Sequence, residues 1–153
     1  MIRTAFLKLV LSLVGLAIFL LIVSQKPNQD LGIKPEAKVK IGSQSILVEI
    51  VESQEEVEKG LSNRDFLASN AGMLFNFPER AVKSFWMKDM KFPLDIIWID
   101  EGKIVGIEEN APTPSETIPA FTSPQPVNKV LEVTAGFVEK NKVKIGDKVE
   151  TVK

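Results

Sequence analysis

Apolar and polar residues alternate from Ala37 onward. AKVKI (37–41) has a period of two, Gly42 and Ser43 are turn residues, and SILVEIV (45–51) places Ile46, Val48 and Ile50 on one face. A period of two is typical of a strand with one buried face. The segment 37–51 is therefore predicted to be a β-hairpin.

The next segment changes to helix signals. Ser53 and Glu56 have the spacing of a capping box, in which each side chain accepts a hydrogen bond from the other residue's backbone N–H. Gly60 can take the left-handed conformation that ends a helix, so a helix of about two turns is expected between them. Asp65 follows Ser62 by three residues, which predicts one further helical turn over 62–67.

The stretch from Gly72 to Asp100, which contains both tryptophans, organises the rest of the chain. Alternation predicts a strand over 73–77, a turn at 78–80 and a returning strand over 82–87. The segment 94–99 is apolar on both faces apart from Asp95, which predicts a strand in the middle of a sheet.

After a glycine-containing turn at 100–103, strands are predicted over 104–107, 130–133 and 148–152, with a short helix over 137–141. A long proline-rich loop, 111–126, interrupts them and has the length typical of a functional loop. The sequence predicts a mainly β domain: an antiparallel sandwich or partly closed barrel of roughly eight strands with two or three short helices.

The amino-terminal segment has a different pattern. Residues 5–23 are almost continuously apolar, which is just long enough to cross a bilayer, and Arg3 and Lys8 lie before or near their start. We expect a membrane anchor at 1–24, a polar linker at 25–36 and one β-rich domain at 37–153. The predicted protein crosses the membrane once and has its carboxy-terminal domain outside the cytoplasm. A cleaved signal peptide, giving a secreted domain, is the alternative.

Composition excludes several classes of function. The chain has 153 residues and a formal net charge of −1, with basic and acidic residues mixed, so no nucleic-acid partner is expected. It has no histidine and no cysteine, which excludes histidine triads, thiol catalysis and zinc sites built on those residues. We predict no cofactor and no metal site.

Two acidic residues interrupt apolar strands. Asp95 lies within 94–99 and Glu132 within 130–133. A carboxylate in such a position must be paired or hydrogen-bonded to offset its desolvation. Either each acid fixes a loop, or the two face each other as an acid/base pair for a glycoside-like substrate.

Three further residues are candidate ligand contacts. Trp86 can offer an exposed ring to a sugar or peptide, or it can belong to the core. Lys88 is a candidate partner for Asp95. Arg64 can bind an anion with its planar guanidinium, or it can form a salt bridge at a helix end.

Several motifs resemble one known family. GLSNRDFL (60–67), GMLFNF (72–77), FWMKDMKFPLDIIWID (85–100), VLEVTAG (130–136) and IGD (145–147) are similar, in order, to domain of unknown function 192. Asp89 and Met90 replace the Asn-Thr of the family motif. The resemblance implies a compact β-rich domain, often exported, with no established activity. The residues of this chain that match the pattern of the family are Gly60, Leu61, Arg64, Gly72, Met73, Leu74, Phe75, Trp86, Met87, Lys88, Pro93, Leu94, Asp95, Glu132 and Gly136.

These observations favour a membrane-tethered binding or interaction module outside the cytoplasm. Its groove is predicted near Trp86, Asp95, Glu132 and the proline-rich loop, and its partner is a glycan, a peptide or an envelope protein. The alternative is a hydrolase that acts on glycan-like substrates through Asp95 and Glu132.

Overall fold

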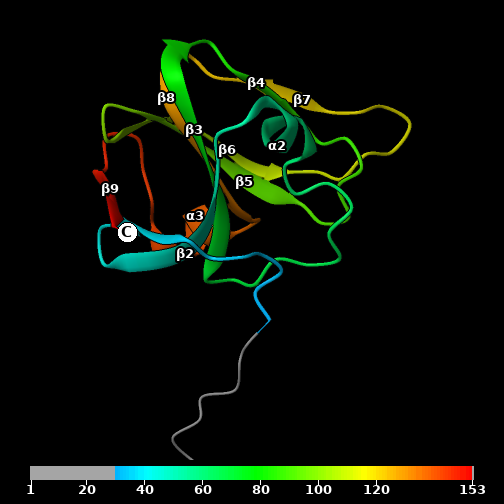
Figure 1. Cartoon of the computed structure of the whole chain (residues 1–153), viewed down its shortest axis with the longest axis horizontal. Coiled ribbons are helices and arrows are strands. Elements are labelled where there is room, and N and C mark those ends of the chain that lie inside the picture. Colours follow the sequence, from blue (N-terminus) through cyan, green and yellow to red (C-terminus); the bar gives the residue numbers. More distant parts are fainter. Residues whose placement is uncertain (1–29, 153) are drawn as a thin grey trace, which may run out of the picture.

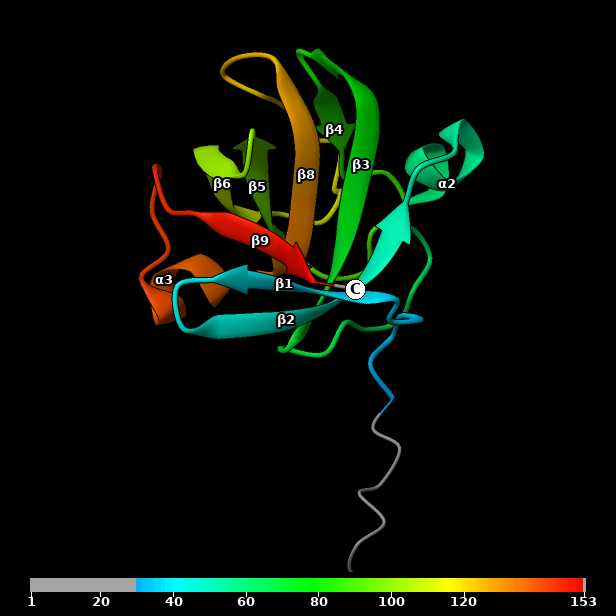
Figure 2. The same ribbon diagram turned by 60° about the vertical axis from the view of Figure 1, so that its left-hand side comes forward.

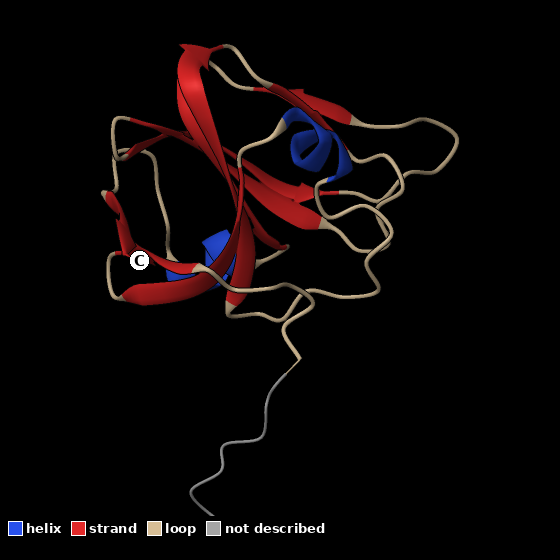
Figure 3. Ribbon diagram, in the orientation of Figure 1, coloured by secondary structure: helices blue, strands red, loops and turns tan. Residues whose placement is uncertain are grey.

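The computed structural model describes residues 30–152, which form a mainly β domain with a curled, half-barrel sheet and two short helices (Figures 1 and 3). The strands are β1 (Ala37–Ile41), β2 (Gln44–Val51), β3 (Ala71–Ala81), β4 (Ser84–Trp86), β5 (Leu94–Asp100), β6 (Lys103–Ala111), β7 (Ala120–Thr122), β8 (Val127–Thr134) and β9 (Val149–Val152). The helices are α2 (Gln54–Lys59) and α3 (Phe137–Asn141).

Seven strands form one sheet in the order β6-β5-β8-β3-β2-β1-β9, and β4 and β7 form a separate two-stranded ribbon. Figure 2 shows β1, β2 and β9 crossing the direction of β3 and β8, so the sheet bends strongly along its length. Its two ends meet where Ile104 and Val149 donate backbone hydrogen bonds to Asp147 and Gly102. The partly closed barrel is thereby confirmed.

The prediction that the strands would all be antiparallel was wrong at one place. β2 and β3 pair in parallel, because α2 and the turns after it carry the chain back to the start of β3. The predicted turn at 78–80 is also wrong: β3 continues through Pro78, and its register against β8 shifts between Asn76 and Ala81. Proline is tolerated at such an irregularity because no regular ladder bond is required there.

Local signals were more accurate. The β1–β2 hairpin is present, and α2 carries the predicted capping box between Ser53 and Glu56, with Gly60 at φ 47° after its last turn. The second predicted helical turn, over 62–67, is a non-helical turn instead. No helix within residues 30–152 is long and apolar enough to cross a membrane, and the predicted anchor at 1–24 lies outside the described residues.

The sheet separates two hydrophobic cores. The core on the side of α2 and the β4–β7 ribbon, here called the α2-side core, contains Met73, Ile96 and Trp98. The core inside the barrel, here called the α3-side core, contains Leu74, Ile97 and Phe137. Because side chains alternate along a strand, β3, β5 and β8 contribute to both cores. This explains why the segment 94–99 is apolar on both faces.

Candidate functional site

Asp95 lies on the α3 side of the sheet and is fully buried. Its Oδ2 accepts a hydrogen bond from the backbone N–H of Val138 at 2.8 Å. Its Oδ1 accepts from the N–H groups of Asn110 at 2.9 Å and Gly136 at 3.3 Å. The carboxylate therefore ties the start of α3 to the end of β6, and its desolvation is compensated by backbone donors.

Glu132 lies on the other side of the same sheet. It is paired with Met73 on one side and Ile96 on the other, and both neighbours belong to the α2-side core. Its exposed fraction is 5%, and burial raises the pKa of its carboxyl group to about 8. Within residues 30–152 its carboxyl group has no hydrogen-bond partner, and the raised pKa favours the protonated form at neutral pH.

The hypothesis of an acid/base pair is therefore wrong. Asp95 pairs with Val133 and Ile96 pairs with Glu132, so the two acids lie at successive positions of the ladder and leave the sheet on opposite faces. Two carboxyl groups separated by a sheet cannot flank one glycosidic bond. Neither acid lines the groove beside Trp86, so the groove predicted from all three residues is not formed.

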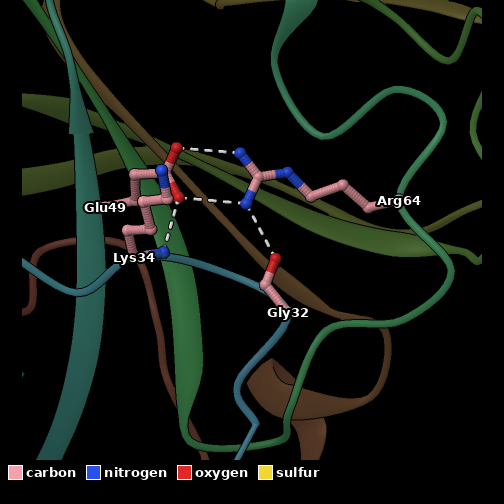
Figure 4. Close-up of polar contacts among 4 residues, drawn as sticks. All are labelled: Gly32, Lys34, Glu49 and Arg64. Atoms are coloured by element: carbon pink, nitrogen blue, oxygen red, sulfur yellow. Dashed lines mark hydrogen bonds and ion pairs between the residues drawn. The ribbon is translucent and has the colours of Figure 1, made fainter.

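Arg64 is held in a salt bridge (Figure 4). Its two terminal nitrogens donate to the carboxylate of Glu49 at 2.8 and 2.9 Å, and one of them also donates to the carbonyl oxygen of Gly32 at 2.7 Å. The backbone N–H of Lys34 donates to the same carboxylate at 2.8 Å. The partner is a β2 residue rather than a helix end, and sequence reasoning did not identify it.

This cluster fastens the segment before β1 to the domain. Leu31 is buried in the α2-side core, and its carbonyl oxygen accepts a hydrogen bond from the N–H of Ala68. Residues 31–36 of the predicted linker therefore pack on the domain. Burial alone raises the pKa of Glu49, but hydrogen bonds from Arg64 and the Lys34 backbone, together with the Arg64 charge, lower it overall.

Trp86 is exposed, whereas its neighbour Phe85 points into the domain. Phe85 makes edge-to-face contacts with Phe75 at 4.7 Å and Trp98 at 5.7 Å between ring centroids. Alternation along β4 then turns Trp86 outward, with 55% of its surface exposed. The Nζ atom of Lys88 lies 5.4 Å from the centroid of the indole, within the range of a cation–π contact.

A groove of about 350 Å³ adjoins Trp86. We call it the Trp86 groove; it is lined by Val57, Glu58, Ser84, Phe85, Trp86 and Ala120. Two of these residues come from α2, three from β4, and Ala120 comes from β7 within the proline-rich segment. Of the residues and segments predicted to form a groove, Trp86 and the proline-rich segment are brought together here.

Sequence reasoning missed the α2 wall of this groove. Val57 and Glu58 lie on a short helix whose position relative to β4 depends on the whole α2-side core. The available signal was the alternation of Ser84, Phe85 and Trp86, which places the first and third on one face of a strand. That signal says nothing of the element beside them.

One family model matches most of the chain. Residues 37–151 match the model of the family described as "Uncharacterized ACR" (DUF192), so the chain belongs to this family of unknown function. No curated protein matches the sequence.

Two crystal structures are similar to the chain. One is a Sinorhizobium meliloti 1021 protein named as a candidate transcription regulator; it is 35% identical, with a TM-score of 0.71 over 78% of this chain and 96% of its own. The other is a Novosphingobium aromaticivorans DSM 12444 protein of unknown function; it is 29% identical, with a TM-score of 0.69 over 82% of this chain and 89% of its own.

Proposed function

We propose that this protein is a membrane-tethered binding module outside the cytoplasm and that its ligand binds in the Trp86 groove. The observation that carries the proposal is an indole with 55% of its surface exposed beside a groove of about 350 Å³. Tryptophan side chains are costly to leave exposed and frequently dominate binding energies. The groove volume lies at the lower end of the range of small-ligand sites.

The other polar candidates support binding rather than catalysis. Asp95 and Arg64 have their hydrogen-bonding capacity engaged within the domain, and Glu132 lies in the α2-side core. The ligand classes that fit an exposed indole with a lysine over it are a glycan, a peptide and a segment of an envelope protein. The name of the S. meliloti relative is not carried over, because a net charge of −1 with mixed signs does not favour a DNA surface.

Binding is testable through the two tryptophans. Trp98 has only 2% of its surface exposed, whereas Trp86 is open to solvent. A ligand in the Trp86 groove should shift the emission of Trp86 and protect it from acrylamide. The measurement is a fluorescence titration with glycans and peptides, with Trp86→Phe as the variant that should lose the response. A ligand-induced signal that persists in Trp86→Phe would place the binding elsewhere.

The tether and the compartment require a separate test. The apolar residues 5–23 and the nearby Arg3 and Lys8 support an anchor whose amino terminus stays in the cytoplasm. Because the chain has no cysteine, Ile145→Cys introduces a single thiol at a side chain with 64% of its surface exposed. A membrane-impermeant maleimide should label this variant in intact cells. Labelling only after lysis would refute the orientation.

A further inference from the structure

Within residues 30–152, β4 is hydrogen-bonded to another strand along one edge only. Its single partner is β7, with Ser84, Phe85 and Trp86 opposite Thr122, Phe121 and Ala120. The N–H of Met87 donates to Pro119, and the N–H of Ser123 donates to the carbonyl oxygen of Lys83. In an antiparallel pair, bonded and non-bonded positions alternate. The backbone groups of residues 83, 85 and 87 therefore face β7.

The backbone groups of Ser84 and Trp86 point to the opposite edge. By this alternation neither residue bonds to β7 through its backbone, and outside the strand ladders no backbone hydrogen bond within residues 30–152 involves their N–H or C=O groups. Ser84 and Trp86 both line the Trp86 groove, whose other wall is formed by Val57 and Glu58 of α2. The two residues together carry two N–H donors and two carbonyl acceptors, at the spacing of alternate strand residues.

We propose that the Trp86 groove receives an extended peptide segment that adds to the outer edge of β4 as a third strand of the ribbon. The inference rests on the proposed function and narrows its ligand class. An extended peptide offers N–H and C=O groups at the same spacing and can form up to four backbone hydrogen bonds with Ser84 and Trp86. A glycan can stack on Trp86 but cannot match this backbone pattern.

The side chains of the groove define which peptide fits. Ser84 and Trp86 lie on the outer face of the ribbon, so the ligand residue beside Trp86 should be β-branched or aromatic, the cross-strand neighbours that stabilise sheets. Glu58 lines the opposite wall, and Glu55 lies one turn before it on the same helix. This acidic wall is complementary to a lysine or arginine of the ligand.

The probe is an acetylated, amidated hexapeptide of alternating threonine and valine with one threonine replaced by lysine. It is titrated into the full-length chain in detergent while Trp86 fluorescence is recorded. Two derivatives carry N-methyl groups on alternate residues, one on the odd set and one on the even set. Each derivative loses the N–H donors of one edge and keeps all side chains. Since strand addition uses one edge of the ligand, one derivative should bind at least about tenfold more weakly, and the other should keep most of its affinity.

Matched variants of the domain test the contribution of the β4 edge and of the α2 wall to peptide binding. Ser84→Pro removes the N–H that points to the free edge and leaves the bonds to β7 in place, whereas Ser84→Ala keeps that N–H. The peptide should bind about tenfold more weakly to Ser84→Pro than to Ser84→Ala. Glu58→Lys should reduce the affinity for the lysine peptide, and Glu58→Gln should reduce it less. If Ser84→Pro does not fold, the N-methylated peptides still decide the question.

Chitotetraose, titrated in parallel, separates this inference from the proposed function. Equal binding of the two N-methylated peptides would overturn strand addition and leave the groove as a binding site. A response to chitotetraose without a response to any peptide would do the same. If neither probe changes Trp86 fluorescence, both strand addition and the groove as a site for these ligand classes are contradicted.

Discussion

Asp95 and Glu132 lie one ladder position apart on neighbouring strands, and their side chains leave the sheet on opposite faces. Asp95 is surrounded by backbone donors near α3, whereas Glu132 is surrounded by apolar side chains below α2. The cost of burying the two carboxyl groups is therefore offset in two different ways. One is compensated by hydrogen bonds, and the other takes up a proton.

Replacing Asp95 by asparagine should destabilise the domain. An amide offers one oxygen acceptor and turns its NH₂ group toward backbone donors, so at least one of the N–H groups of Asn110, Gly136 and Val138 is left without a partner. We expect the free energy of unfolding to fall by about 2 to 4 kcal/mol at pH 7. Urea denaturation of residues 27–153 measures it. Unchanged stability would show that these bonds contribute little to the fold.

Replacing Glu132 by glutamine should stabilise the domain at high pH. The folded-state pKa of Glu132 is raised above its ordinary value of 4.5 to about 8, so the native state binds this proton more tightly than the unfolded chain does. Its contribution to stability is complete below pH 4.5 and is lost as the pH rises toward 8.

In wild type this contribution should decrease by up to about 1.4 kcal/mol per pH unit across that window. Glu132→Gln should remove the slope and be the more stable protein at pH 8. Urea midpoints of both proteins at pH 5, 6, 7 and 8 measure the difference. Parallel pH profiles would indicate that Glu132 is ionised in the native state.

The Arg64–Glu49 pair should control how firmly residues 31–34 are held. Because the pKa of Glu49 is lowered overall, the stability that its carboxylate contributes is present above its ordinary pKa of 4.5 and is lost as the pH falls through the folded-state pKa. Arg64→Ala should lower the free energy of unfolding by about 1 to 2 kcal/mol, between the values for exposed and buried pairs.

The local effect is measured by hydrogen exchange. Protection of the Lys34 and Ala68 amides, which bond to Glu49 and Leu31, should decrease in Arg64→Ala and in Glu49→Gln. The Glu36 amide bonds to Val48 in the adjacent ladder and serves as the control. An equal loss of protection at Glu36 would mean that the whole domain opens, not the segment alone.

Gly72 should not tolerate a side chain. A Cβ atom at this position would lie 2.7 Å from the backbone oxygen of Glu132 and 3.1 Å from Val133 Cγ1. Since a backbone oxygen in the middle of a sheet cannot move aside, Gly72→Ala should cost about 1 to 3 kcal/mol. Gly42→Ala, in a left-handed turn with nothing within 4 Å, is the control and should cost about 1 kcal/mol. Thermal unfolding of both variants compares them.

Local signals in the sequence determined most of the strands, the α2 capping box and the placement of Leu94–Asp100 inside a sheet. These features depend on residues close together in the chain, and alternation or capping reports them directly. The sequence also showed that Asp95 and Glu132 needed an explanation, since charged groups in apolar strands are costly.

Only the tertiary structure decided what surrounds these residues. Which face each acid occupies depends on strand register, and a shift of one residue would exchange the two faces. The Glu49 partner of Arg64 and the α2 wall beside Trp86 come from segments distant in the sequence, brought together by packing of the α2-side core. Contacts of this kind leave no periodic pattern along the chain, because they depend on how the elements pack rather than on how each one forms.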